Sequence, residues 1–202
     1  MKLVATVSSL KEVKLAEKAD LIEIRLDLFN RVWEAIDEIR GIEKEIIATC
    51  RRERDGGKFT GREEERIEAL RKFAEETNVA YVDVECDMPD SAFNFDCEII
   101  ESYHNFKETP DYSELRSIVE GKRGDLVKVV TMGRSKKDVG KIVKLLLEFE
   151  GVIAFLMGKE FSFTRIMAAY LGSPFIYCHV GESKAPGQIH LNDAYKILKT
   201  LG

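Results

Sequence analysis

Stretches typical of buried strands alternate with stretches typical of amphipathic helices along the whole chain. The expected strands cover residues 2–7, 21–26, 45–49, 80–84, 97–102, 126–131, 152–156 and 175–179. The expected helices cover residues 10–18, 32–39, 62–76, 111–120, 135–149, 164–170 and 191–201. No linker or low-complexity segment interrupts the alternation. This pattern predicts an α/β fold, a single (β/α)₈ TIM barrel over residues 1–202.

The length of the chain restricts how such a barrel is built. This fold usually takes about 250 residues, whereas the chain has 202, so we expect tight loops. Residues 87–96, after the fourth expected strand, leave little room for a helix. A doubly wound open sheet is the alternative, but eight strands of so regular a period favour closure. No GxGxxG or GxxxxGK[ST] motif occurs, which counts against a nucleotide site.

Composition and charge exclude several kinds of partner. The net charge is -5 with both signs mixed throughout, so we expect no nucleic-acid partner. No apolar run reaches the length of a membrane span, and the N-terminus does not resemble a signal peptide, so we expect no membrane association. No CxxC pair occurs, which favours reduced thiols and a cytoplasmic location. The four cysteines are Cys50, Cys86, Cys97 and Cys178.

A lysine stands in the middle of the sixth expected strand. The sequence Leu126-Val-Lys128-Val-Val-Thr131 is otherwise apolar or β-branched, as expected for a strand covered on both faces. Burial of an ammonium group is costly unless the group is paired or loses its proton. Lys128 is therefore either a neutral, reactive amine or half of an ion pair.

The second expected strand carries three charged residues at alternate positions. Glu23, Arg25 and Asp27 share one face of the strand, because successive side chains point to opposite sides. They line the barrel mouth in one interpretation, and form a self-satisfied ion-pair row in the other.

Polar residues also follow the third and fourth expected strands. Arg51 precedes a turn that contains Asp55 and two glycines, a pattern that suits either an anion site or a solvated loop. Asp83 and Glu85 share a face, and we interpret them as a structural acid pair or as salt-bridge partners.

The fifth, seventh and eighth strands end in further candidates. His104 follows the fifth strand, where a histidine can act as an acid or base near neutral pH, although a histidine taken alone is more often structural. Arg165 begins the helix after the seventh strand and could hold an anion. Residues 181–188 form a polar loop with two glycines and a proline, which could be a mobile lid. We interpret His179 and His190 as structural, because no metal-ligand spacing supports them.

In this order, the motifs resemble those of type I 3-dehydroquinate dehydratase, the Schiff-base-forming hydro-lyase family of the shikimate pathway of aromatic amino acid biosynthesis. The resemblance runs through the whole chain. The matching pieces are Glu23-Ile-Arg25-Leu-Asp27, Arg51 with Asp55-Gly56-Gly57, Ser102-Tyr-His104-Asn-Phe-Lys-Glu-Thr-Pro110, Asp125-Leu-Val-Lys128, Met157-Gly158 with Thr164-Arg165, and Ala185-Pro-Gly-Gln188. Each piece is weak by itself, whereas six in order at strand ends form a specific signal.

The resemblance implies a single catalytic barrel domain that is commonly dimeric and needs no metal or organic cofactor. It implies that Lys128 forms an imine with the ketone of 3-dehydroquinate, and that His104 is the general acid/base. Neighbouring arginine charges would favour the neutral amine that attacks the ketone. Arg165 would bind the substrate carboxylate. The remaining substrate-binding residues implied are Glu23, Arg25, Arg51, Asp55, Ser183 and Gln188.

Three positions differ from the family pattern. Asp55 stands where glutamate is frequent, Phe155 where methionine is frequent, and Lys184 where serine is common; Ser183 lies one residue earlier. The first expected strand begins at residue 2, so we expect no N-terminal hairpin across the barrel floor.

Two other functions share parts of the pattern. A Schiff-base aldolase or transaldolase would use the lysine, and a non-catalytic barrel could bind a carboxylated ring or a protein.

Overall fold

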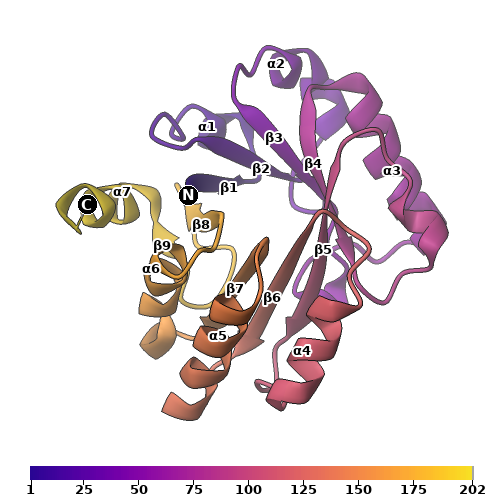
Figure 1. Ribbon diagram of the computed structural model, residues 1–202. Coiled ribbons are helices and arrows are strands. Elements are labelled where there is room, and N and C mark those ends of the chain that lie inside the picture. The colour runs from indigo at the N-terminus through magenta and orange to yellow at the C-terminus, as the bar shows by residue number, and fades with distance from the viewer. Residues whose placement is uncertain (202) are drawn as a thin grey trace.

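The computed structural model describes residues 1–201, in which nine parallel strands form one curled sheet (Figure 1). The strand order is β7-β6-β5-β4-β3-β2-β1-β8-β9. The strands are β1 Lys2–Val7, β2 Leu21–Arg25, β3 Glu45–Thr49, β4 Val79–Glu85, β5 Glu98–Asn105, β6 Leu126–Met132, β7 Val152–Met157, β8 Phe175–His179 and β9 Ile189–His190. All eight predicted strands are present, and β9 is an addition after the last of them.

The strand order excludes the doubly wound alternative. Neighbours in the sheet follow the chain from β1 to β7, and β8 pairs with β1 on the other side. A doubly wound sheet instead reverses its order at a switch point. The observed cyclic order is that of a (β/α)₈ barrel, so the predicted fold class is confirmed.

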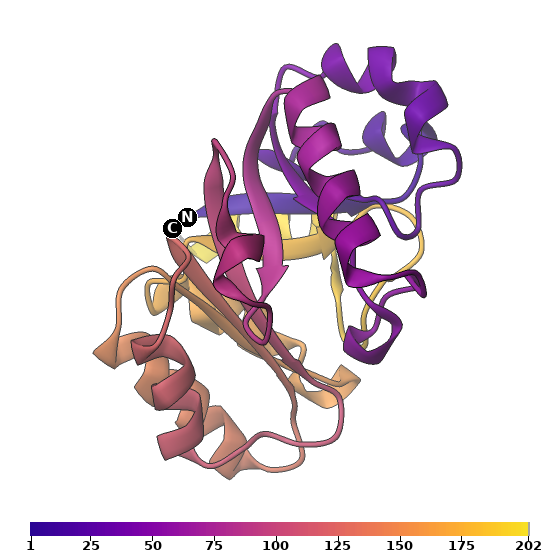
Figure 2. The same cartoon turned by 90° about the vertical axis from the view of Figure 1, so that its right-hand side faces the viewer.

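Helices follow most of the strands and lie on the outside of the sheet (Figure 2). They are α1 Leu10–Val13, α2 Ile36–Arg40, α3 Glu63–Glu76, α4 Tyr112–Glu120, α5 Lys136–Glu148, α6 Phe163–Tyr170 and α7 Leu191–Leu201. A 3-10 turn, Val32–Ala35, precedes α2. Between β4 and β5 the chain forms only the 3-10 turn Asp90–Phe93, as the short segment predicted. Within residues 1–201, no helix has the length and apolar character needed to cross a membrane.

The first helix is shorter than the sequence pattern predicts. The pattern extends to residue 18, but α1 ends after Val13. Beyond that point the backbone continues in tight turns, with Ala16 N–H donating to the Val13 carbonyl and Ala19 N–H to the Ala16 carbonyl, both at 3.0 Å. These turns bury Ala16 and Ala19 against the sheet, so tertiary packing overrides the local helical pattern.

Side-chain alternation along the strands produces a core inside the barrel and two cores outside it. The inner core consists of Val4, Leu21, Ile47, Ile100, Val130, Ile153, Phe155, Met157, Phe175 and Tyr177. One outer core lies between β1–β4 and β8 and the helices α1–α3 and α7; the other lies between β6–β7 and α4–α6. In β6, Val127 and Val129 belong to the outer core, so Lys128 and Val130 face inward.

The barrel wall is incomplete between β7 and β8. In the described part of the chain, the hydrogen-bonded order runs from β7 at one end to β9 at the other, so no backbone ladder joins β7 to β8. Side chains and a loop span this seam instead. The rings of Phe155 and Tyr177 lie 6.5 Å apart across it, and Gly158 N–H donates to the Pro186 carbonyl at 3.3 Å.

An exposed glycine in the middle of α5 offers a stabilising substitution. Gly140 has ordinary helical φ, and a Cβ added there meets no atom within 4 Å. Alanine loses less conformational freedom than glycine when a helix forms. We expect Gly140→Ala to increase the free energy of unfolding by about 0.5 to 1 kcal/mol. Urea denaturation followed by circular dichroism measures this change, and an unchanged or lower midpoint would contradict it.

Candidate active site

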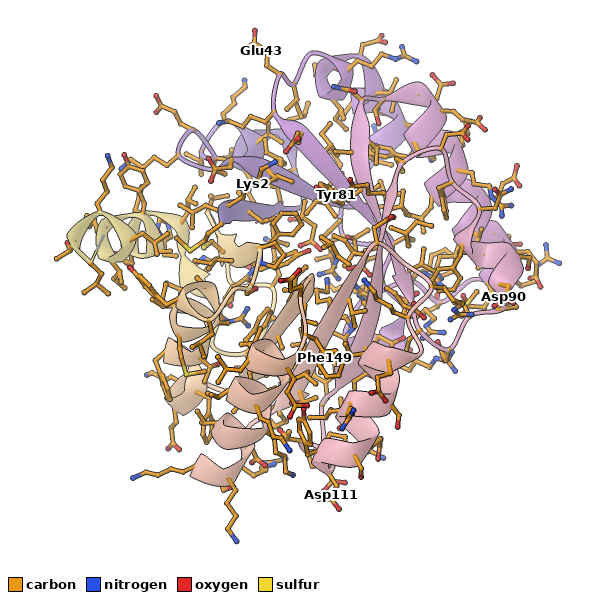
Figure 3. All side chains as sticks on the ribbon, viewed as in Figure 1. Lys2, Glu43, Tyr81, Asp90, Asp111 and Phe149 are labelled. Carbon is orange, nitrogen blue, oxygen red and sulfur yellow. The ribbon has the colours of Figure 1, made fainter. Side chains whose placement is uncertain are left out.

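A cavity opens at the carboxyl ends of the strands, where barrels carry their chemistry. Figure 3 labels Lys2 and Tyr81, which lie near the amino ends of β1 and β4, the opposite ends of these strands from the cavity. The cavity is lined by Thr6, Glu23, Arg25, Arg51, Asp55, Gly56, His104, Phe106, Lys128, Val130, Phe155, Met157, Arg165, Tyr177, Lys184, Ala185 and Gln188. All the predicted site residues except Ser183 are in this set.

Lys128 is buried at the base of the cavity and forms an ion pair with Asp83. Its Nζ also lies 4.6 Å from the centre of the Tyr177 ring. Of the two possibilities that the strand pattern left open for Lys128, the structure shows the ion pair. The pairing follows from register, because β4 and β6 are the two neighbours of β5 and their inward side chains converge.

Arg51 holds the carboxylate that pairs with the lysine. Its Nη2 donates to Asp83 at 2.7 Å, and Ser102 Oγ donates to the same carboxylate oxygen at 2.7 Å. Burial alone would raise the pKa of Asp83, but the charges of Arg51 and Lys128 lower it well below its usual range. Asp83 is thus held ionised beneath the lysine.

A second buried carboxylate joins this cluster to helix α3. Glu85 accepts from Arg51 Nη1 at 2.9 Å and pairs with Arg66 Nη1 at 2.7 Å. Arg66 itself is fully buried on α3 and also donates to the Cys50 carbonyl at 2.9 Å. The Asp83–Glu85 pair that the sequence indicated is therefore a set of salt-bridge partners that links the helix layer to Lys128.

His104 lies near the end of β5, on the edge of the same cavity. Its Nδ1 is buried and has no hydrogen-bond partner among residues 1–201. Burial lowers the pKa of His104 well below its usual value, and the charges of Arg51 and Lys128 lower it further, although Asp83 opposes them. The imidazole is therefore neutral at pH 7, which is the form that can act as a base.

This lowered pKa predicts a pH dependence of folding. Below about pH 6.5 the histidine of the unfolded chain binds a proton that the folded state does not, so stability falls as pH falls. We expect His104→Gln to reduce that loss by up to about 1.4 kcal/mol per pH unit, because glutamine does not titrate. Urea unfolding of both proteins at pH 7 and pH 5.5 measures the difference; equal losses would contradict the prediction.

Arg165 is a buried cation without a carboxylate partner in the described part of the chain. Its Nε donates to the Gly187 carbonyl at 3.1 Å, and its guanidinium lies 4.1 Å from the Phe155 ring centre. Nη2 is buried and has no partner there. Burial lowers the pKa of Arg165 to about 10. A buried cation of this kind is costly unless an anion joins it, which makes Arg165 suited to hold a ligand carboxylate.

The predicted row of charged residues lies partly on β2 and partly beyond its end, because β2 ends at Arg25 and Asp27 is in the following turn. Arg25 pairs with Asp27 through contacts of 2.9 and 2.7 Å. Glu23 has no cationic partner in the described residues and instead accepts from Thr6 Oγ1 at 2.7 Å and Thr49 Oγ1 at 2.9 Å. Glu23 and Arg25 face the cavity, whereas Asp27 orients Arg25 from outside it.

The glycine turn after β3 brings Asp55 to the cavity. A Cβ on Gly57 would lie 2.0 Å from the Arg51 carbonyl oxygen, so only glycine fits this close approach. Asp55 Oδ2 contacts Arg52 Nε at 2.5 Å, which fixes the carboxylate. Asp55 and Gly56 of this turn line the cavity.

The loop after β8 contributes Gln188 and Lys184 to the cavity but not Ser183. Gln188 Nε2 donates to Thr6 Oγ1 at 3.2 Å. Ser183 is exposed, and its hydroxyl donates to the Ala185 carbonyl at 2.8 Å. His179 and His190 lie outside the cavity, with their rings 5.2 Å apart.

Sequence reasoning did not identify several residues at the site. Tyr177, Thr6 and Phe106 line the cavity, and Asp83, which the sequence indicated as a salt-bridge partner, pairs with Lys128. Alternation along β8 could have identified Tyr177, because it shares a face with Phe175. The contact between Asp83 and Lys128 joins residues 45 positions apart, and no local pattern predicts it.

A (β/α)₈ barrel with ionisable groups gathered at the carboxyl ends of its strands is an enzyme architecture. A sequence model of the family described as Type I 3-dehydroquinase matches residues 4–202. A 3-dehydroquinate dehydratase of Archaeoglobus fulgidus is 61% identical over 202 residues, covering 100% of both chains. One of Methanopyrus kandleri is 36% identical over 193 residues, covering 91% of this chain and 88% of the relative.

Solved structures agree with these sequence relatives. The crystal structure of the 3-dehydroquinate dehydratase from Aquifex aeolicus matches with a TM-score of 0.79 at 26% identity, covering 100% of this chain and 99% of that one. The enzyme from Geobacillus kaustophilus shares the fold with a TM-score of 0.83 at 24% identity, covering 99% and 90%. The chain belongs to the type I 3-dehydroquinase family. The predicted family and enzyme class, a hydro-lyase, are thus confirmed.

Proposed function

We propose that this chain removes water from 3-dehydroquinate to give 3-dehydroshikimate, through an imine on Lys128 and with His104 as the general acid/base. The observation that carries the proposal is the convergence of three groups in one cavity: a buried lysine, a neutral histidine and a buried arginine without a carboxylate partner in the described part of the chain. Family membership supports the same reaction.

The reaction begins when the neutral amine of Lys128 attacks the substrate ketone and water leaves to form the protonated imine. The ammonium proton must first go elsewhere. Arg51 keeps Asp83 ionised, so the neutral His104 is the better acceptor in this cavity. His104 then gives this proton to the carbinolamine hydroxyl, which leaves as water, and the histidine is neutral again before the next step. Binding of the substrate carboxylate at Arg165 would neutralise that buried cation and fix the ring relative to the lysine.

The protonated imine then acts as an electron sink. His104 removes a proton from C2, the electron pair moves into the imine to give an enamine, and the hydroxyl on C1 leaves as the pair returns. His104 gives the proton back to the departing hydroxyl, which leaves as water. Hydrolysis of the imine releases the enone and restores Lys128. Glu23, Arg25, Arg51, Asp55 and Gln188 would hold the ring hydroxyls and neighbouring groups.

Borohydride reduction tests the imine. Reduction in the presence of 3-dehydroquinate should leave a stable adduct on the peptide that contains Lys128. The cavity contains a second lysine, Lys184, which serves as an internal control in the same mass spectrum. An adduct on the Lys184 peptide, or no adduct at all, would contradict the proposal. The ultraviolet absorbance of the enone product reports turnover, and a comparison with sugar phosphates separates this reaction from that of an aldolase.

A further inference from the structure

Residues 181–188, here called the β8–β9 loop, lie across the seam where the barrel wall is incomplete. The loop is fixed on one side to the segment from the end of β7 to α6, where Gly158 N–H donates to the Pro186 carbonyl and Arg165 Nε donates to the Gly187 carbonyl. A Cβ on Gly187 would lie 2.3 Å from the Gly158 carbonyl oxygen, so the two backbones are in close contact. The loop therefore lies beside the cavity at the gap between β7 and β8.

On the other side, the loop is fixed to the β1–α1 segment by an ion pair. Lys184 Nζ lies 2.7 Å from Glu12 Oε1 on α1. The other oxygen of Glu12 accepts from Ser8 N–H at 2.7 Å and from Ser8 Oγ at 3.0 Å. These two hydrogen bonds from Ser8 fix the orientation of the Glu12 carboxylate independently of Lys184.

The pair is well shielded from solvent. The Lys184 and Glu12 side chains are 11% and 13% exposed, so salt and water screen it less than a surface pair. Burial alone would raise the pKa of Glu12, but Lys184 and Ser8 lower it, so the carboxylate is charged at neutral pH. Among residues 1–201, no other salt bridge involves a residue of this loop.

The ion pair also orients a residue that faces the cavity. Lys184 N–H donates to Gln188 Oε1 at 2.9 Å, and Gln188 Nε2 then donates to Thr6 Oγ1. Displacement of Lys184 would therefore displace the Gln188 amide, which lines the site.

We propose that Lys184, through its ion pair with Glu12, is a positioning residue that holds the β8–β9 loop over the cavity and orients Gln188 toward the substrate. This inference rests on the proposed function for its kinetic part. Whether the ion pair holds the loop in place is a separate question, which hydrogen exchange of the loop amides without added ligand answers.

Three variants of the 202-residue protein test the ion pair. Lys184→Met removes the charge but keeps the apolar stem, and Glu12→Gln removes the charge but keeps acceptors for Ser8. Lys184→Arg keeps the ion pair. We expect each of the first two to raise KM for 3-dehydroquinate roughly tenfold, the scale of one charge-assisted hydrogen bond, and to lower kcat by much less. Lys184→Arg should remain close to the parent protein.

The double variant Glu12→Gln/Lys184→Met shows whether the two residues act as a unit. If they do, its KM matches that of either single variant, because the second substitution removes nothing further. Hydrogen exchange of the amides in residues 181–188, measured without ligand, should be faster in all three charge-removing proteins. Lys144→Met, which removes an exposed pair with Glu148 on α5, should change neither measurement.

Two results would overturn the inference. Unchanged loop exchange in the charge-removing variants would show that the pair does not hold the loop. A raised KM in Lys184→Met but not in Glu12→Gln would show that the lysine acts on the substrate directly. Failure of the proposed function would give a different result, because the parent protein would then form no Lys128 adduct. The hydrogen-exchange measurements would still test whether the ion pair holds the loop.

Discussion

Replacement of Lys128 by methionine should abolish turnover of 3-dehydroquinate while the protein remains folded. The imine supplies the electron sink for proton removal, and loss of a covalent nucleophile lowers kcat by several orders of magnitude, here at least about 10⁴-fold. Folding should persist because Asp83 keeps Arg51 and Ser102 as partners. Enone absorbance measures the rate, and circular dichroism with thermal unfolding reports the fold.

A second substitution at this position separates covalent from electrostatic roles. Lys128→Arg keeps a positive charge beside Asp83 but has no amine that forms an imine at neutral pH. We expect it to be as inactive as Lys128→Met. Exposed Lys144, replaced by methionine, is the control for general effects of lysine loss. Substantial turnover by the arginine variant would show that the lysine contributes charge rather than a covalent bond.

The other large effect should be on stability. Glu85→Gln removes the carboxylate that Arg51 and Arg66 share, and leaves both guanidinium groups buried with one anionic contact fewer. Removal of one partner from a buried ion pair typically costs about 3 kcal/mol or more, because the remaining charge loses its compensation. We therefore expect a clear decrease in the free energy of unfolding, measured by urea denaturation.

The matched control is an ion pair of the same chemistry on the surface. Glu120 pairs with Arg116 on α4 at 2.9 Å, and both side chains are about half exposed. Glu120→Gln should leave the denaturation midpoint nearly unchanged, because exposed pairs contribute little. Equal effects of the two substitutions would show that burial does not determine the contribution of Glu85.

Patterns of alternation predicted most of the fold correctly, and the errors have a physical cause. β1, β3 and β8 begin and end at the predicted residues, because each consists mainly of apolar or β-branched residues that suit a buried strand. The helix expected over residues 10–18 ends at Val13, because burial of Ala16 and Ala19 against the sheet outweighs local helical preference. The ninth strand has only two residues and forms because β8 offers its edge, which no local pattern indicates.

At the candidate site, the sequence by itself determined which chemical groups follow which strand. Because side chains alternate along a strand, Glu23 and Arg25 must share a face. The sequence also shows that Lys128 differs from its apolar neighbours. These properties depend only on residues close together in the chain.

Only the tertiary structure decided how those groups are paired. It joined Lys128 to Asp83, left Arg165 without a carboxylate among the described residues, and directed Lys184 rather than Ser183 toward the cavity. Lys184 and Glu12 are 172 positions apart in the chain. Such contacts depend on sheet register and loop packing, and these are fixed only when the whole barrel assembles, so a pattern of neighbouring residues cannot contain them.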